Sequence, residues 1–280
     1  MNSLTDAPTD FTNLVGAFLF ACFRVRSVTM LQFMGARLDP FPAVVIENRL
    51  VDFLCGDETK LVTTPNPEML ILGQKHKNLG DVLQNSDLGC VDGTGVVGLL
   101  KMKGVHGVER ITGIDTIWTL AKICSQQNKR MMLVGARPGV AAEAKESLLA
   151  KYPNLQIHSY VGPNMSYKIE GTSPFAKDDE EVLTEIDNFK PDVLAVALGA
   201  GKQEVWLNKY KDRFSSVKIL IGIGGAFDMI SGALPRAPLF FRKIGLEWMW
   251  RLFLQPTRVA RIFRAVVIFP VVAMKHKITY

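Results

Sequence analysis

Asp92 stands at a position in the chain where an acid could do chemistry. It follows a short apolar run, Leu88 to Val91, and precedes the glycine-rich stretch Gly93-Thr94-Gly95. Open α/β sheets usually keep their chemistry at such a position, where a strand ends and glycines lead into a helix. We therefore predict that Asp92 is a catalytic base.

Two other interpretations of these residues are open. The run Gly93 to Gly98 fits the pattern G-x-G-x-x-G, which would indicate a NAD-type oxidoreductase. Asp92 could instead cap the following helix by accepting a backbone N–H, in a non-catalytic, membrane-bound nucleotide-binding module. The NAD interpretation is the weaker one, because it requires an acid at the end of the next strand, and neither Glu109 nor Asp115 lies at a predicted strand end.

The composition indicates a globular chain with an apolar attachment. Apolar residues make up 48% of the 280 residues, and the mean hydropathy of +0.15 is high for a soluble protein. The charged fraction of 21% excludes an integral membrane protein. The apolar run Leu14 to Phe23 is too short to span a bilayer and lacks the basic flank of a signal peptide, so we expect it to form a helix packed on the domain.

The cysteines and histidines predict neither a disulfide framework nor a metal site. No two cysteines form a C-x-x-C pair, which indicates a reducing cytosol. The histidines lack the spacing of metal ligands, and no D-x-D motif is present to hold a metal-bound nucleotide. We therefore predict no metal and no cofactor. The residues concerned are Cys22, Cys55, Cys90, Cys124, His76, His106, His158 and His276.

The positive charge of the chain is concentrated near its C-terminus. The segment from Arg236 to Arg264 contains seven basic residues and one acid, Glu247, so it carries the whole formal net charge of +6. Such a local excess indicates an anionic partner. Tryptophans and phenylalanines interleaved with arginines are typical of a helix that lies in an anionic bilayer surface, although an ordinary packed helix pair with solvated arginines is the alternative. We predict a membrane surface as the partner of residues 236–280, and no nucleic acid.

Apolar runs that alternate with helical patterns predict a Rossmann-like α/β fold, with a parallel sheet flanked by helices on both faces. The alternation stops after Gly232. We divide the chain into a helical leader (1–34), the Rossmann-like domain (35–234) and a basic, amphipathic helical appendage (235–280), whose two or three helices are expected to break at Pro256 and Pro270. The predicted strands are Lys60 to Thr64, Leu88 to Val91, Arg130 to Gly135, Leu155 to Val161, Asp192 to Leu198 and Lys218 to Ile223. The predicted helices are Pro42 to Leu54, Pro67 to His76, Thr94 to Lys103, Asp115 to Gln127, Pro138 to Lys151, Lys177 to Asn188, and one through Trp206 to Tyr210.

The residues that follow these strands should converge, because parallel strands end on one edge of a sheet. Glycine recurs among them where a backbone must approach a ligand closely, and the helix starts there offer free N–H groups to phosphate. We therefore predict a nucleotide-sized anion site at this edge. Its residues are Thr64, Asn66, Asp92, Thr94, Gly135, Arg137, Gly162, Gly199 to Gln203, Gly224, Gly225 and Asp228.

Seven sequence blocks, in order and with sensible spacing between about residues 35 and 264, resemble the WecG/TagA/CpsF glycosyltransferase family. Together they are far more specific than any single motif. They are Thr64-Pro65-Asn66-Pro67-Glu68, Asp92-Gly93-Thr94-Gly95, Glu109-Arg110-Ile111-Thr112-Gly113, Lys202-Gln203-Glu204, Gly224-Gly225-Ala226-Phe227-Asp228, Arg236-Ala237-Pro238 and Gly245-Leu246-Glu247-Trp248.

The resemblance implies an inverting transfer from a UDP-sugar to an undecaprenyl-diphosphate-linked sugar, in cell-surface polysaccharide or teichoic acid synthesis. The sugar would be N-acetylmannosamine or a related hexose or uronic acid, and the reaction would take place at the cytoplasmic face of the cell membrane. With no D-x-D motif, arginines would replace a metal ion at the leaving diphosphate. A homo-oligomer that hides the site is compatible with such a chain.

The resemblance also implies roles for individual residues. Its proposed base falls on Asp92, and further catalytic positions fall on Thr64, Arg110 and Gln203. The appendage arginines that close over the diphosphate fall on Arg251, Arg258 and Arg261. From the matched blocks we also expect substrate contacts at Asn66, Thr94, Lys202, Glu204, Gly225, Asp228 and Arg236. The anion site predicted at the edge of the sheet adds Gly135 and Gly199.

Each of these positions also has a structural alternative. Arg110 could pair with Glu109 or Asp115, Gln203 could merely start a helix, Thr64 and Asn66 could be plain caps, and Asp228 could either fix a turn or touch the uridine. The chain departs from the family pattern at two positions: Gly201 replaces the usual proline before Lys-Gln-Glu, and Gln255 replaces the usual acid before the appendage proline.

Overall fold

The core of the protein is a six-stranded parallel sheet. The computed structural model describes residues 30–163 and 177–280. The strand order is β4-β3-β8-β7-β5-β6, and every pairing in this sheet is parallel. The predicted parallel sheet is thus confirmed. The strands are β3 (Lys60–Thr63), β4 (Leu88–Gly89), β5 (Arg130–Gly135), β6 (Gln156–Tyr160), β7 (Val193–Ala197) and β8 (Ile219–Gly222).

Helices cover both faces of this sheet, because its strands bury side chains on both sides. Along β5, Met131 and Leu133 face one buried cluster, while Met132 and Val134 face another, as expected for side chains that alternate along a strand. The first face is covered by α2 (Ala43–Cys55), α6 (Gly113–Gln127), α7 (Val140–Lys151) and the short α10 (Ala226–Ile230). The second face is covered by α4 (Lys77–Gln84), α8 (Lys177–Phe189) and α9 (Lys202–Tyr210).

A small antiparallel sheet ties the C-terminus to the first strand that the structure describes. It has the order β2-β1-β9 and consists of β1 (Leu31–Phe33), β2 (Ala36–Leu38) and β9 (Ile278–Thr279). Met34 and Gly35 turn the chain between β1 and β2 with φ of 52° and 66°, the left-handed backbone that two-residue hairpins need. This sheet packs with α3 (Pro67–Lys75), α5 (Thr94–Met102) and the C-terminal helix α14 (Phe269–Ala273) around a third buried cluster.

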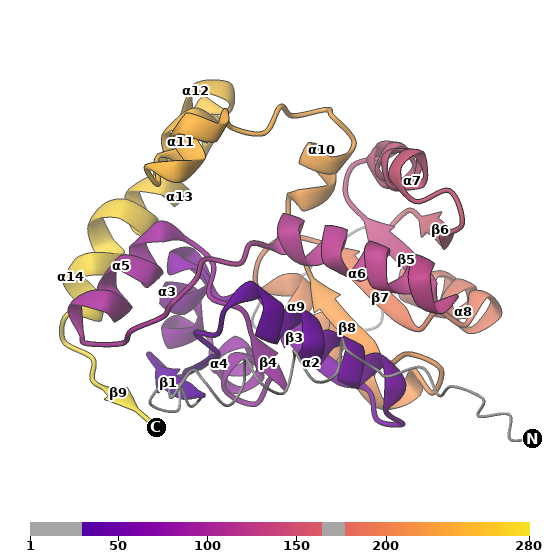
Figure 1. Cartoon of the computed structure of the whole chain (residues 1–280), viewed down its shortest axis with the longest axis horizontal. Helices are drawn as coiled ribbons and strands as arrows, with labels where there is room; N and C mark the ends of the chain where they lie inside the picture. Colours follow the sequence, from indigo (N-terminus) through magenta and orange to yellow (C-terminus); the bar gives the residue numbers. More distant parts are fainter. Residues whose placement is uncertain (1–29, 164–176) are drawn as a thin grey trace, which may run out of the picture.

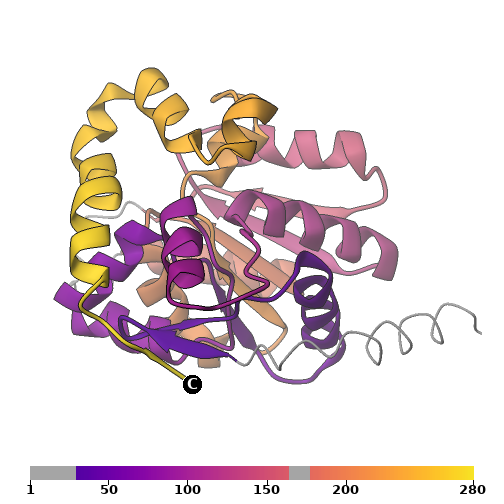
Figure 2. The same cartoon turned by 60° about the vertical axis from the view of Figure 1, so that its left-hand side comes forward.

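Between the main sheet and α14, the chain forms an arch of short helices, which we call the C-terminal arch (residues 236–268). Figures 1 and 2 show it rising from the main sheet beyond α10 and descending beside α5 and α3. It contains α11 (Leu239–Lys243), α12 (Glu247–Leu254), η2 (Pro256–Arg258), α13 (Val259–Phe263) and the π-helical turn η3 (Arg264–Ile268), which runs directly into α14.

The structure corrects two expectations about the C-terminal region and two about helices earlier in the chain. Pro270 does not break the helix, because the wider π turn at 264–268 precedes it and accommodates the missing N–H. A strand, β9, is present where only helices were expected, and Phe269 and Ala273 are fully buried in the core. Helix α4 was also not predicted, and α7 begins at Val140 after Gly139 rather than at Pro138.

The helix predicted for Leu14 to Phe23 lies outside the described residues, and residues 31–33 of the predicted leader are strand β1. Across residues 30–163 and 177–280, no helix combines the length and the apolar character that crossing a membrane requires.

Candidate active site

A cavity of about 1200 Å³ lies at the carboxyl ends of the parallel strands, beneath the C-terminal arch. Residues that follow each of the six strands line it, as the topology predicts, and the arch contributes the opposite wall. Of the predicted site residues, those on the cavity wall are Thr64, Asn66, Asp92, Thr94, Arg110, Arg137, Gly162, Gly199, Ala200, Gln203, Gly224, Gly225, Asp228, Arg251, Arg258 and Arg261.

Asp92 reaches this cavity from the loop between β4 and α5. Its backbone N–H donates to the carbonyl of Pro65 at 3.1 Å, and its carboxylate accepts the N–H of Gly93 at 2.6 Å. The N-cap of α5 is Gly93, with φ of 85°, and no side chain caps this helix. Asp92 therefore does not serve as the helix cap that the structural alternative required.

The surroundings of Asp92 raise the proton affinity of its carboxylate. Burial raises its pKa to about 6, while Arg110 and the Gly93 N–H favour the ionised form and oppose this rise. A carboxylate with a pKa of about 6 is ionised at neutral pH, yet it binds a proton far more strongly than a free aspartate does. Asp92 is thus suited to accept a proton during a reaction.

Gly93 and Gly95, which follow Asp92, contact other parts of the protein, and Gly93 also lines the cavity. A Cβ on Gly93 would lie 2.7 Å from Cδ of Pro67, so only glycine fits there. A Cβ on Gly95 would contact Pro67 and Phe269 at 3.6 and 3.7 Å. The preceding strand β4 is also an edge strand of the sheet. A dinucleotide fingerprint normally brings its glycines to a pyrophosphate, so this packing does not favour the NAD interpretation.

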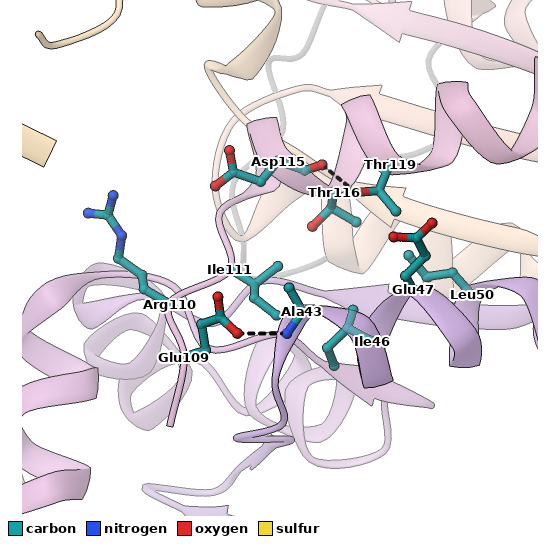
Figure 3. A pocket seen from close by; sticks show the side chains of 10 residues that line it. All are labelled: Ala43, Ile46, Glu47, Leu50, Glu109, Arg110, Ile111, Asp115, Thr116 and Thr119. Carbon is teal, nitrogen blue, oxygen red and sulfur yellow. Dashed lines mark hydrogen bonds between the residues drawn. The ribbon is translucent and has the colours of Figure 1, made fainter. Parts of the chain in front are cut away.

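Arg110 lies in an extended stretch whose side chains alternate in direction. Figure 3 shows Glu109 pointing toward α2, where it accepts the N–H of Ala43 at 2.8 Å, and Arg110 pointing away from that helix. Nη2 of Arg110 lies 3.0 Å from Oε2 of Glu247, which belongs to the arch. The alternative pairing with Glu109 or Asp115 is not formed. Arg110 instead joins the wall of the large cavity to the arch.

A smaller cavity of about 150 Å³ lies on the other side of Arg110, between α2 and α6. Its polar side chains are already engaged: Glu47 pairs with Lys122 at 2.7 Å, and the hydroxyl of Thr119 donates to the carbonyl of Asp115 at 3.0 Å. This space is too small for a nucleotide. The larger cavity is therefore the candidate site.

Gln203 and Glu204 form a buried link between the loops that follow β7 and β8. The Gln203 amide donates to Oε1 of Glu204 at 2.7 Å and accepts the N–H of Gly224 at 3.0 Å, while Oε2 of Glu204 accepts the N–H of Gly201 at 2.7 Å. Burial raises the pKa of Glu204 to about 7. Gln203 faces the cavity with its amide held in one orientation, and Glu204 lies behind it, outside the cavity wall.

Several polar residues of the cavity wall are partly engaged in local structure. Asn66 caps α3 by accepting the N–H of Met69 at 3.0 Å, as its capping interpretation predicts, and it also faces the cavity. The Thr94 hydroxyl donates to the carbonyl of Gly245 in the arch at 3.2 Å. Asp228 accepts from Arg137 at 2.9 Å. Asn66 therefore both caps α3 and lines the cavity, and Thr94 and Asp228 line it while holding contacts within the protein.

The arch carries more positive charge into the cavity than the neighbouring carboxylates neutralise. Arg261 pairs with Glu68, but no carboxylate in the described part of the chain forms an ion pair with Arg251 or Arg258. Burial lowers the pKa of both arginines, to about 10 for Arg258, whose pKa the charges of Arg251 and Arg261 lower further. Arg251 donates instead to the carbonyl of Gly225, at 3.4 Å. Two partly buried cations without an ion-pair partner indicate a site for an anion.

Four predicted substrate contacts lie away from the cavity. Gly135 packs against β7, where a Cβ would lie 2.6 Å from the carbonyl oxygen of Ala197. Arg236 pairs with Asp115 at 2.7 Å and, more distantly, with Glu247. Lys202 and Glu204 do not belong to the cavity lining either. Glu204 instead contacts Gln203, which does line the cavity.

Sequence reasoning did not identify Glu68, Glu247 and Trp248 as side chains that face the cavity. One signal was available for Glu247, because it is the single acid within a strongly basic segment. Among residues 30–163 and 177–280, no group of three or more histidine, cysteine or acidic side chains is arranged to hold a metal ion.

Comparison with known proteins identifies related sequences over nearly the whole chain. The model of the "Glycosyl transferase WecG/TagA/CpsF family" matches residues 31–280, so the similarity extends beyond residue 264 and includes β1 and β9. A Bacillus spizizenii protein is 30% identical over 239 residues, which are 85% of this chain and 87% of that protein. A Bacillus subtilis protein is 31% identical over 217 residues (78% and 79%), and one from Staphylococcus aureus is 29% identical over 237 residues (82% and 86%). All three are named N-acetylglucosaminyldiphosphoundecaprenol N-acetyl-beta-D-mannosaminyltransferase.

Proposed function

The chain belongs to the WecG/TagA/CpsF glycosyltransferase family, and from this we propose that it transfers N-acetylmannosamine from a UDP-sugar to N-acetylglucosaminyl-diphosphoundecaprenol. The acceptor and the sugar are those in the names of its relatives. The product would be an intermediate of teichoic acid or another cell-surface polysaccharide.

One observation supports this function above the others: a basic carboxylate and unpaired arginines share one cavity. Asp92 lies on the sheet side, and Arg251 and Arg258 lie on the arch side. Sugar transfer needs a base at the attacking hydroxyl and cations at the departing diphosphate. The cavity volume of about 1200 Å³ is sufficient for a nucleotide sugar together with the sugar end of an acceptor.

In the proposed reaction Asp92 takes the proton from the acceptor hydroxyl as that oxygen attacks the anomeric carbon of the donor. The new carbon–oxygen bond forms as the bond from the anomeric carbon to the diphosphate oxygen breaks, so the configuration inverts. UDP leaves with the bonding electrons, and guanidinium groups receive the charge that develops on it. Because arginines supply these cations, we propose that the transfer does not depend on a metal ion.

The function is tested by supplying UDP-N-acetylmannosamine and a short-chain polyprenyl-diphosphate-linked N-acetylglucosamine, and by detecting the disaccharide-lipid by mass spectrometry. We expect product with this donor at a rate that EDTA does not change. UDP-N-acetylglucosamine and UDP-glucose are the alternative donors with which UDP-N-acetylmannosamine is compared. Product from another donor alone would replace the sugar assignment, and loss of the rate on chelation would overturn the metal-independent mechanism.

We also propose that the arch binds the cytoplasmic face of the membrane, where the lipid-linked acceptor is held. Large apolar side chains of the arch are exposed, including Phe240 (67%), Phe253 (72%) and Phe263 (54%). An apolar surface beside basic residues is the pattern of an interfacial helix. The exposed arch thus supports a peripheral association.

Substituting Phe240, Phe253 and Phe263 together by serine is expected to reduce flotation with anionic liposomes at least tenfold, because each buried aromatic side chain contributes about 1.5–3 kcal/mol to apolar burial. Val44→Ser, which alters a 63% exposed side chain on α2, is the control and should float normally. Deleting residues 236–280 is a poor test, because it would remove β9 and the buried Phe269. Unchanged flotation of the triple variant would rule out this surface.

A further inference from the structure

Arg261 is held differently from the other cavity arginines of the arch. Its Nε lies 2.9 Å from both carboxylate oxygens of Glu68, and its Nη2 lies 2.7 Å from Oε2. The Glu68 side chain is only 15% exposed. Such a multidentate pair is the strongest and geometrically most specific form of an arginine–carboxylate contact.

The pairing divides the three arch arginines that line the cavity into two kinds. Glu68 neutralises Arg261 and occupies the Nε–Nη2 edge of its guanidinium, one of the two edges that can meet a phosphate. Arg251 and Arg258 form no ion pair with a carboxylate in the described residues, and burial lowers the pKa of both. Of the three, only Arg251 and Arg258 could receive a diphosphate without first breaking an ion pair.

Glu68 is itself fixed relative to the base. It lies in the first turn of α3, where Pro67 begins the helix, Asn66 caps it, and the helix dipole favours an acid. The same segment holds the loop of Asp92, because the carbonyl of Pro65 accepts the Asp92 N–H, and Gly93 lies against Pro67. A contact to Glu68 is therefore a contact to the frame that positions Asp92.

We propose that Arg261 is a positioning residue and Glu68 its anchor: together they fasten η2 and α13 over the cavity so that Arg258, three residues before Arg261, faces the diphosphate. The pair acts as a tether between the arch and the base loop, and Arg261 is not a diphosphate ligand. The proposal rests on the proposed function only in taking Arg251 and Arg258 as the diphosphate ligands.

The tether is tested first without any activity measurement, by hydrogen–deuterium exchange of residues 256–268 in the full-length protein. Glu68→Gln and Arg261→Gln should each speed exchange in this segment by a similar factor, roughly threefold to tenfold, because either change releases the same contact. Arg258→Gln is the matched control, since Arg258 lies in the same segment without a carboxylate partner. If Arg261→Gln changed the hydrogen–deuterium exchange rate of this segment and Glu68→Gln did not, the result would contradict the tether.

The second test exchanges the two charges. Glu68→Arg and Arg261→Glu alone are each expected to lower kcat/KM for sugar transfer by about tenfold or more, and the two together should restore it to within about threefold of the wild type. A diphosphate ligand cannot be restored in this way, so a double variant as slow as Arg261→Glu would overturn the proposal.

A double-mutant cycle with glutamine is used if the variant that carries both exchanged charges does not fold. If the two residues act only through each other, Glu68→Gln combined with Arg261→Gln should cost no more activity than either change alone. Additive losses would show that Arg261 has a second role. If no UDP-sugar supports transfer, the proposed function fails, while the exchange rates of residues 256–268 still decide whether the tether exists.

Discussion

Asp92→Asn is expected to lower the rate of sugar transfer by about 10²- to 10⁴-fold, the usual contribution of a general base. The affinity for UDP should change little, because the arginines that would hold the diphosphate remain. Asparagine can still accept the N–H of Gly93, so the loop keeps its hydrogen bond. Transfer assays and UDP calorimetry on the same preparation measure the two effects. Turnover equal to that of the wild type would exclude Asp92 as the base.

The thermal stability of this variant separates lost chemistry from lost structure. The pKa of Asp92 is raised in the folded protein to about 6, above its ordinary value, so the carboxyl favours the folded state when protonated, and this contribution is lost as the pH rises through about 6. At pH 7.5 the wild type therefore carries the cost of a partly buried, ionised carboxylate, which asparagine removes. We expect the Tm of Asp92→Asn to be a few degrees higher than that of the wild type.

The pH dependence of the wild-type enzyme should report the same group. Only the ionised carboxylate can take a proton, so kcat/KM is expected to fall tenfold per pH unit below about pH 6. The limb should be absent from the residual activity of Asp92→Asn. A limb near pH 4 in the wild type would mean that the carboxylate is not buried during the reaction.

Replacing Arg251 and Arg258 together by glutamine is expected to lower kcat/KM by about 10³-fold or more, because removing a single group that stabilises developing charge typically costs 10²- to 10³-fold. The dissociation constant of UDP should rise at least tenfold, since both changes remove cations from the cavity wall. This result would differ from that of Asp92→Asn, in which only catalysis is lost. Calorimetry with UDP and steady-state kinetics with the lipid acceptor distinguish them.

Arg264→Gln is the matched control for this double variant. Arg264 lies on the same arch but outside the cavity wall, and its Nε donates to the carbonyl of Ala260 at 3.2 Å. Arg264→Gln should leave UDP binding unchanged. If it weakened UDP binding as much as the double variant does, overall charge rather than specific contacts would be the cause.

Replacing Arg251 and Arg258 should also make the folded protein more stable, because burial disfavours both charges.

Much of the domain and part of the site could be predicted from local patterns. Runs of apolar residues between helical patterns identify β5 and β7 nearly to the residue, because a strand buried on both faces needs side chains that are apolar throughout. Since parallel strands all end on one edge, the same pattern also predicts that Asp92, Gln203 and Asp228 converge. The prediction is weaker where elements are short, as in α10 and β9, because a few residues carry little periodicity.

The sequence by itself determined the parallel sheet, the edge at which chemistry is placed, and the excess of arginine near the C-terminus. Only the tertiary structure decided how those arginines are used. Arg261 meets Glu68 across 193 positions of sequence, and Arg110 meets Glu247 across 137, while Arg251 and Arg258 are left without a carboxylate in the described part of the chain. Strand and helix patterns arise from neighbours in the sequence, whereas an ion pair depends on how distant elements pack. Which cations remain free for an anion is therefore a property of the folded arch.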